Sequence, residues 1–108
     1  AGILALADEF VAAIEADNLA AAGWPRSMYG VSKLLEVAYT YTLASELAPA
    51  GIVVNAVCPG YCATAMSSYG GPRTPAQGAE TPVWCALRPG RPADITSGFY
   101  SDKTLIAW

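Results

Sequence analysis

At 108 residues the chain is long enough for one small domain, and it is 54% hydrophobic but only 14% charged. No uninterrupted apolar run approaches the ~18 residues that a membrane span needs, and a net charge of −3 without a basic cluster argues against nucleic-acid binding. Because histidine is absent, Ser-His-Asp and Cys-His catalytic sites are excluded within these residues, and we expect no metal site.

The three cysteines are Cys58, Cys62 and Cys85, and they form no C-x-x-C pair. Their odd number and irregular spacing favour reduced, buried thiols that act as small hydrophobic residues, and disfavour a disulfide framework. The first seven residues are apolar but lack the basic residues that begin a secretory signal. We therefore expect a cytoplasmic protein.

The first predicted element is an amphipathic helix from about Leu6 to Leu19. Acidic residues occupy the positions between its apolar ones, and Gly23 with Pro25 ends the pattern. The apolar positions at helical spacing are Leu6, Phe10, Val11 and Ile14.

A second helix is predicted from about Met28 to Ala48, with Ser27 as its N-cap and with Pro49 and Gly51 ending it. This helix is apolar nearly all round, so we expect it to be buried on more than one side. Its large apolar side chains are Val31, Leu34, Leu35, Val37, Tyr39, Tyr41, Leu43 and Leu47.

The segment Ile52–Val57 is rich in β-branched residues and predicts a buried parallel strand, which the Pro59-Gly60 turn ends. A capping-box pattern with proline at the first helical position, Thr74 to Gln77, predicts a third helix to about Leu87. Residues 98–101 are a candidate last strand. The last three elements read as one βαβ unit, but two strands cannot cover three helices, so we expect an incomplete domain.

Tyr29 and Lys33 stand four residues apart at the start of the second helix, which places them on one helix face. An ammonium group favours the phenolate, so Lys33 is expected to lower the tyrosine pKa from about 10 and to prepare Tyr29 for proton transfer. With six tyrosines in the chain, the spacing alone has odds of about one in ten of arising by chance. The alternative is an amphipathic tyrosine beside a lysine whose stem covers apolar surface.

The pentapeptide YGVSK at 29–33, the strand at 52–57 and the following Cys58-Pro59-Gly60 together resemble the short-chain dehydrogenase/reductase family. In that family a Y-x-x-x-K helix precedes a strand ending in N-x-x-x-P-G, and a threonine that contacts the cofactor follows. Here Asn55 begins the second pattern and Thr64 is the threonine. This conjunction is far more specific than the tyrosine–lysine pair.

A closer resemblance, to the monomeric carbonyl reductase branch, extends through Phe10-Val11, Gly23-Trp24-Pro25, the stretch 77–83 and the stretch 98–108. It implies an α/β fold: the C-terminal part of a Rossmann-like doubly wound parallel sheet, in the order helix, helix, strand, helix, strand. Residues 1–27 would be an insertion helix and loop. Residues 28–108 would supply the catalytic helix, the P-G turn and the final βαβ unit.

The resemblance also implies roles for individual residues. Tyr29 would be the proton donor in carbonyl reduction and would touch the cofactor, and Lys33 would bind the ribose hydroxyls of the nicotinamide cofactor. Cys62, Ala63 and Thr64 match the stretch that holds the nicotinamide carboxamide and a nearby phosphate; the alternative for Thr64 is an ordinary turn residue. NADPH is the cofactor implied, with NADH as the alternative.

Three apolar side chains are candidates for the substrate pocket: Met28, Tyr61 and Met66. Helix or loop packing is the equal alternative for each of them. The tryptophans, Trp24, Trp84 and Trp108, are expected to be packing residues.

Two functions of different classes follow. In the first, the parent protein reduces small carbonyl compounds (ketones, aldehydes or quinones) with NADPH; the insertion favours a monomer, with a dimer as the alternative. The isolated chain should be inactive, because the family's glycine-rich phosphate-binding turn and catalytic serine have no counterpart in it. In the second, the chain is a non-catalytic remnant that acts as a packing or protein-interaction module.

Overall fold

A computed structural model describes residues 2–107 and divides the chain into two compact units, Ala1–Tyr39 and Thr40–Trp108. Each unit is described by itself. The helices are α1 (Gly2–Glu15), α2 (Met28–Leu47), α3 (Pro75–Leu87) and α4 (Pro92–Ile95), with the short 3-10 helices η1 (Ala48–Ala50) and η2 (Ala65–Ser67). The strands are β1 (Ala56–Cys58), β2 (Phe99–Ser101) and β3 (Thr104–Leu105).

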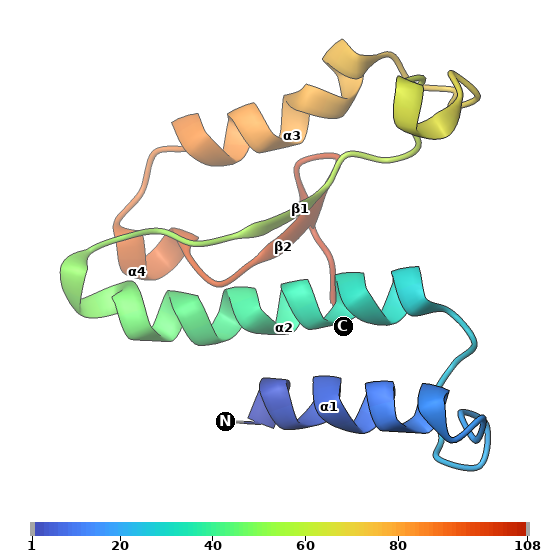
Figure 1. Cartoon of the computed structure of the whole chain (residues 1–108). Helices are drawn as coiled ribbons and strands as arrows, with labels where there is room; N and C mark the ends of the chain where they lie inside the picture. The colour runs from blue at the N-terminus through green and yellow to red at the C-terminus, as the bar shows by residue number, and fades with distance from the viewer. Residues whose placement is uncertain (1, 108) are drawn as a thin grey trace. The chain divides into compact units, whose positions relative to one another are not determined.

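In the first unit, α1 runs antiparallel to the N-terminal part of α2 (Figure 1). The side chains of Phe10 and Ala13 on α1 are buried. The ring of Trp24 meets that of Phe10 edge-on, with 5.2 Å between the ring centroids. Trp24 is therefore a packing residue, as predicted; Trp108 lies outside the described residues.

Helix α1 begins and ends about four residues earlier than the sequence pattern predicted. Its C-terminal end is a Schellman motif, in which the amides of Asp17 and Asn18 donate to the carbonyls of Ile14 and Ala13, each over 3.0 Å. Asp17 adopts a left-handed φ of 49°. The end was missed because this position usually holds glycine or asparagine, and an aspartate there does not stand out in the sequence.

Helix α2 agrees with its prediction at both ends. The Ser27 hydroxyl accepts a 3.0 Å hydrogen bond from the Gly30 amide, which confirms the N-cap. At the other end, η1 contains Pro49 and is closed by Gly51 at a φ of 68°. The expectation of burial on more than one side is wrong, because Leu34 is 49% exposed and Tyr39 is 54% exposed. A chain of this length has too little surface to enclose every face of so long a helix.

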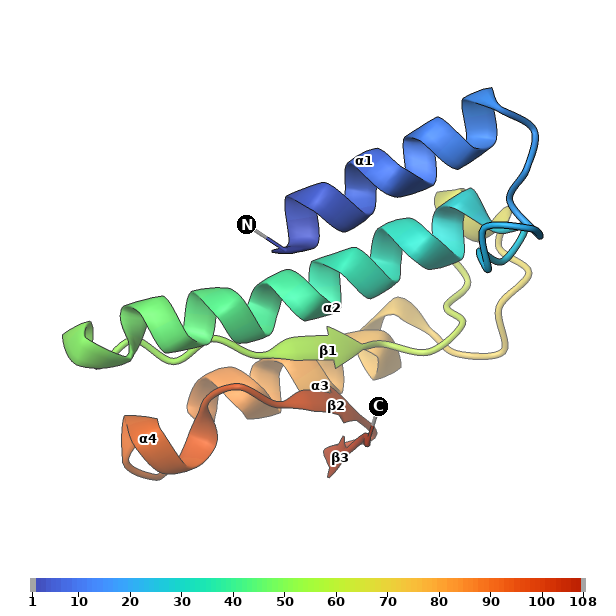
Figure 2. The ribbon, with the colours of Figure 1, turned by 90° about the horizontal axis from the view of Figure 1, so that it is seen from below.

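In the second unit, β1, β2 and β3 form one sheet in that order (Figure 2), and α3 packs beside β1. Strands β1 and β2 are parallel, with Ala56 opposite Phe99, as expected for a βαβ unit. The bounds of α3 are those predicted. Its capping box is present, with the Gln77 amide donating to the Thr74 hydroxyl over 3.2 Å and the Thr74 amide donating to the Gln77 side chain over 2.8 Å.

The regular part of β1 is shorter than the predicted strand at 52–57, because side chains hold the residues before it. The Asn55 amide group donates to the Ile95 carbonyl, and the Asn55 side-chain oxygen accepts from the Gly98 amide, both over 2.8 Å. The Val54 amide donates to the Thr96 hydroxyl over 3.0 Å. Asn55 therefore joins the start of β1 to the chain that enters β2, a role that its place in N-x-x-x-P-G did not by itself disclose.

The sheet also contains a strand that the sequence did not predict. Strand β3 pairs antiparallel with β2 through a two-residue turn, Asp102-Lys103, whose φ angles of 49° and 60° are those of a type I′ hairpin. Such turns are recognised in a sequence by Asn-Gly or Asp-Gly, and this one carries no glycine. The short helix α4 was also missed, because four residues leave no periodic pattern.

The described sheet has β1 at its edge, beside a hollow of about 430 Å³. The hollow is lined mainly by apolar side chains, among them Val53, Val57, Pro82 and Ile95. An edge strand beside an uncovered apolar hollow is typical of part of a larger sheet. None of the helices described between residues 2 and 107 is both long and apolar enough to cross a membrane.

The cysteines are free thiols, as predicted, but each is only partly buried. The expectation that they are buried is therefore met only in part, since β1, which carries Cys58, lies at the edge of the described sheet. Partial burial raises the pKa of the Cys85 thiol, which favours its neutral form. Trp84 packs its ring edge-on against Tyr100 at 5.5 Å, confirming the packing role predicted for it.

Candidate functional site

Tyr29 and Lys33 lie on one face of the first turns of α2, as their spacing predicted. The Lys33 ammonium stands 5.8 Å from the centre of the Tyr29 ring. The phenol is open to solvent, with Tyr29 65% exposed. Within the first unit, the pair therefore presents a proton-bearing hydroxyl and a cation side by side on an accessible helix face.

A third residue, which sequence reasoning missed, contacts the lysine of this pair. The Lys33 ammonium donates to both carboxylate oxygens of Glu36 at 3.0 Å, and these hydrogen bonds raise the pKa of Lys33 above its ordinary value of 10.5. The spacing i,i+3 between a lysine and a glutamate is the signal that could have found it. The sequence pattern paired the Lys33 ammonium with the Tyr29 phenol alone, but in the structure the same ammonium also contacts the Glu36 carboxylate.

Replacing Glu36 with glutamine should bring the pKa of Lys33 down toward its ordinary value, because the hydrogen-bonded carboxylate is the main cause of the rise. Because the pKa of Lys33 is raised in the folded state, its interaction with Glu36 stabilises the fold fully at pH values below the ordinary lysine pKa. This stabilisation is lost as the pH rises through the folded-state pKa. Titration of the Lys33 side-chain NMR shift measures the change. Glu46→Gln on the same helix is the control. An unchanged Lys33 titration in Glu36→Gln contradicts the assignment.

Met28 lines an apolar groove of the first unit with a volume of about 370 Å³. Side chains of α1, including Leu4, Phe10 and Val11, form the other wall. The Met28 side chain is 67% exposed, so it covers the rim of the groove without being enclosed by it. Both alternatives for Met28, substrate contact and helix packing, fit this position.

The stretch Cys62–Thr64 follows the Pro59-Gly60 turn, and one hydroxyl that the sequence did not single out makes hydrogen bonds to both of its ends. The Ser67 Oγ accepts from the Thr64 amide at 3.1 Å and donates to the Cys62 carbonyl. The Thr64 carbonyl accepts from the Tyr69 amide over 2.8 Å. Thr64 thus precedes the short helix η2 as its N-cap residue, in the turn role offered as its alternative, and its side chain is half-buried.

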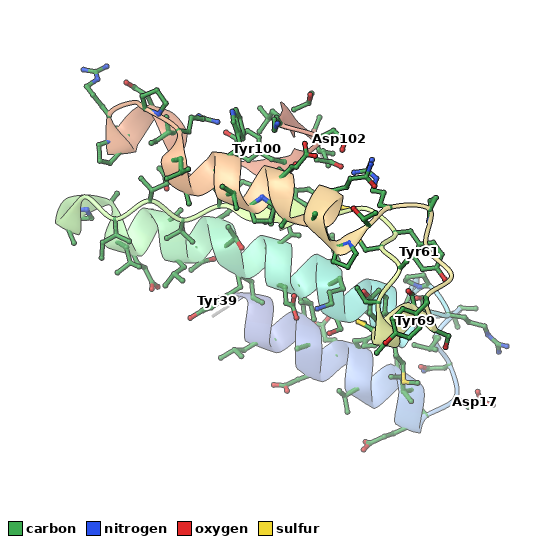
Figure 3. All side chains as sticks on the ribbon, turned by 90° about the horizontal axis from the view of Figure 1, so that it is seen from above. Asp17, Tyr39, Tyr61, Tyr69, Tyr100 and Asp102 are labelled. Carbon is green, nitrogen blue, oxygen red and sulfur yellow. The ribbon has the colours of Figure 1, made fainter. Side chains whose placement is uncertain are left out.

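The returning part of the same loop packs directly on the stretch Cys62–Thr64. A Cβ atom on Gly71 would lie 2.4 Å from the Cys62 carbonyl carbon, so only glycine fits there. Tyr61 and Met66, the other candidate substrate contacts, are 60% and 83% exposed. Figure 3 shows Tyr61 and Tyr69 on this loop, which therefore carries accessible apolar side chains next to an ordered backbone.

The Cys62 thiol fills the space between this loop and α3. Its Sγ bonds to the carbonyls of Pro59 and Gly60, each at 3.6 Å. A Cβ atom on the buried Gly78 of α3 would lie 2.4 Å from that sulfur. The helix can approach the loop this closely because position 78 has no side chain.

The contact between Cys62 and Gly78 predicts that the effect of Gly78→Ala on stability changes sign with the residue at position 62. Gly78→Ala alone should destabilise the chain, because overpacking costs about 1–3 kcal/mol. In a Cys62→Ala background the same change should stabilise it by up to about 1 kcal/mol, because alanine is the better helix former. Chemical denaturation of the four variants measures both effects. Equal effects of Gly78→Ala in the two backgrounds contradict the contact.

The predicted site residues therefore fall into two groups. Tyr29, Lys33 and Met28 belong to the first unit, and the stretch 61–66 belongs to the second. A nicotinamide cofactor also needs a place for its phosphates. Helix α3 is the α-helix that follows β1, and backbone amides at a helix N-terminus can bind phosphate. One of these amides, that of Gln77, already donates to the Thr74 hydroxyl. Among the residues that the structure describes, no turn with the G-x-x-x-G-x-G spacing joins a strand to a helix N-terminus, so no cradle for a pyrophosphate is found there.

Comparison with known proteins gives concordant matches. A family model described as Enoyl-(Acyl carrier protein) reductase matches residues 11–102. Carbonyl reductase [NADPH] 3 of Rattus norvegicus is 41% identical over 90 residues, covering 80% of this chain and 32% of the rat protein. Carbonyl reductase [NADPH] 1 of Rattus norvegicus is 34% identical over 110 residues, 98% of this chain and 40% of the rat protein. Carbonyl reductase [NADPH] 1 of Homo sapiens is 36% identical over 90 residues, 80% of this chain and 32% of the human protein.

The chain spans between 32% and 40% of the length of these relatives. In the second of them, the match includes nearly all of the chain.

Proposed function

The chain belongs to the short-chain dehydrogenase/reductase family, and we propose that it is the C-terminal portion of a single domain that reduces small carbonyl compounds with NADPH. Within that portion, residues 1–27 form the insertion helix and loop, and residues 28–108 form the catalytic helix, the P-G turn and the final βαβ unit. Ketones, aldehydes and quinones are the proposed substrates. NADPH is preferred to NADH because the relatives that match carry NADPH in their names.

One observation supports the proposal most: an accessible phenol and ammonium, those of Tyr29 and Lys33, share one turn of helix with 5.8 Å from the cation to the ring centre. A second supports it independently. Ser67, Gly71 and the P-G turn order the half-buried backbone of Cys62–Thr64 through hydrogen bonds and close packing. An ordered backbone and a paired phenol are what cofactor orientation and proton transfer require.

In the proposed reaction, bound NADPH supplies the hydride that reduces the carbonyl carbon. The Tyr29 hydroxyl donates its proton to the carbonyl oxygen as negative charge develops there. The Lys33 ammonium stabilises the phenolate left on Tyr29 and binds the ribose hydroxyls. The backbone of Cys62, Ala63 and Thr64 orients the nicotinamide ring, and Tyr61 with Met66 offers apolar surface to the substrate.

We propose that the isolated chain is inactive. The glycine-rich turn that holds the pyrophosphate in this family is not among its residues, so cofactor binding should fail first. The serine that stabilises the developing oxyanion is also lacking, since residues 1–26 contain neither serine nor threonine. Losing one such donor commonly costs about 10²–10³ in rate.

The second candidate function is a packing or interaction module without catalysis. The exposure of Leu34 and Tyr39 on α2 favours it, because apolar side chains on a helix face invite association. The first unit carries the predicted insertion, so the proposed parent protein is a monomer, with a dimer through α2 as the alternative. We propose a cytoplasmic location on the basis of the reduced cysteines.

The experiment that tests the proposal completes the chain. A chimaera joins the part of Rattus norvegicus Carbonyl reductase [NADPH] 1 that precedes its match, which covers 98% of this chain, to residues 1–108 of this chain. NADPH oxidation is followed with a quinone and with a reactive aldehyde, and the intact rat protein is the positive control. Turnover by the chimaera, and none by the isolated chain, is expected. A chimaera that unfolds cooperatively but shows no turnover contradicts the proposal and favours the interaction module.

A further inference from the structure

Arg73 holds the two sides of the loop 59–74 together through its backbone. Its amide donates to the Tyr61 carbonyl over 3.2 Å, and its carbonyl accepts from the Ala63 amide over 2.8 Å. Arg73 thereby pairs in parallel with Cys62, the residue between them. The stretch proposed to orient the nicotinamide is thus one side of a short ladder, and Arg73 is the other.

The Arg73 side chain joins this ladder to the C-terminal hairpin. Its guanidinium makes a bidentate ion pair with Asp102, with nitrogen–oxygen distances of 2.6 and 2.8 Å. One of the same nitrogens donates to the Pro59 carbonyl at 3.4 Å. The left-handed Gly60 leaves room for the arginine, because a Cβ atom there would lie 2.7 Å from the Arg73 Nε.

Asp102 is itself fixed in place. It occupies the first central position of the type I′ turn between β2 and β3 (Figure 3). The next residue, Lys103, donates its amide to the buried Thr81 hydroxyl at 3.2 Å and its ammonium to Glu80 at 3.4 Å, so the turn is attached to α3. A bidentate pair to such a turn restrains the guanidinium in orientation as well as in position.

We propose that the Arg73–Asp102 ion pair positions the backbone of Cys62–Thr64 for the nicotinamide cofactor, which makes Arg73 a positioning residue of the reductase site. This inference rests on the proposed function and names a residue that the tyrosine–lysine pattern does not include. The hairpin, which lies outside the Y-x-x-x-K and N-x-x-x-P-G patterns, thereby acts on cofactor binding through Arg73.

A second arginine–aspartate ion pair, elsewhere in the chain, supplies a matched control. Arg91 and Asp94 also form a two-nitrogen ion pair, with a shortest distance of 2.8 Å, on α4 and the residue before it. Its two hydrogen bonds join residues of one helical turn, and neither reaches the loop 59–74. Removing Arg91 therefore changes charge equally and leaves the ladder intact.

The test compares Arg73→Ala, Asp102→Asn and the charge-exchanged double variant Arg73→Asp with Asp102→Arg, using Arg91→Ala as control. In the isolated chain, amide hydrogen exchange at Ala63 should be roughly two- to fivefold faster in the single variants, which is the range for an exposed ion pair. The double variant should recover part of the protection. In the chimaera, the KM for NADPH should rise by a similar factor while kcat changes less, and Arg91→Ala should alter neither.

Each outcome decides something. Unchanged exchange at Ala63 in the single variants overturns the positioning role, and so does faster exchange without any change in the KM for NADPH. If the charge-exchanged double variant recovers neither the protection of the Ala63 amide nor the KM for NADPH, the ion pair is not what positions the stretch Cys62–Thr64. If the unaltered chimaera folds but binds no NADPH, the proposed function itself fails, and this inference falls with it.

Discussion

Replacing Tyr29 with phenylalanine in the chimaera should lower kcat/KM for carbonyl reduction by roughly 10²–10⁴, the usual contribution of a positioned general acid. The change removes one oxygen from a side chain that is 65% exposed, so the fold should be unaffected. NADPH affinity should fall much less, because the ring and Lys33 remain. Steady-state kinetics with NADPH titration separates the two quantities.

Tyr39 provides the control for this substitution. It lies on the same helix and is 54% exposed, but it stands ten positions from Tyr29, away from the Lys33 ammonium. Tyr39→Phe should leave kcat/KM within about a factor of two, as expected for a surface change. If Tyr29→Phe and Tyr39→Phe reduce activity equally, the phenol of Tyr29 is not the proton donor.

Gly71→Ala should strongly destabilise the second unit. The added Cβ would lie 2.4 Å from the Cys62 carbonyl carbon and 2.6 Å from the Tyr61 carbonyl oxygen, and both are backbone atoms that move only with the chain. Overpacking of this kind costs about 1–3 kcal/mol in unfolding free energy. It should also displace the backbone proposed to hold the nicotinamide. Thermal unfolding of the isolated chain and the KM for NADPH of the chimaera measure the two effects.

The neighbouring Gly70 distinguishes this contact from the general cost of altering the loop. A Cβ atom there would stand 3.3 Å from the Ser67 carbonyl oxygen and 3.4 Å from the Tyr61 hydroxyl, which small movements can accommodate. Gly70→Ala should therefore change the midpoint of unfolding much less than Gly71→Ala does. Equal shifts in the two variants would mean that the cost comes from altering the loop in general and not from the contact at Gly71.

Local sequence rules predicted the elements whose ends are marked by specific residues. Ser27 and Thr74 supply side-chain caps, and Gly51 supplies a left-handed C-terminal residue, so α2 and α3 were placed within about a residue. The elements that were misplaced end on residues with no such preference. Asp17 ends α1 in a left-handed conformation, and the turn Asp102-Lys103 forms a hairpin without glycine.

The candidate site divides in the same way. Tyr29 and Lys33 were predictable because helical spacing alone fixes their geometry. The contacts that order the stretch Cys62–Thr64 were not, because Ser67 and Arg73 reach it through a loop and a hairpin whose course depends on long-range pairing. Their importance follows only from hydrogen bonds between segments that are distant in the sequence.

The proposed NADPH site is divided: this chain holds one part of it, and an N-terminal portion of the parent protein holds the rest. The most direct test is a fluorescence titration of NADPH against three proteins: the isolated chain, the N-terminal portion of the rat relative, and the chimaera of the two. Saturable binding by the chimaera alone is the result predicted here. Saturable NADPH binding by the isolated chain, or none by a cooperatively folded chimaera, would contradict the claim.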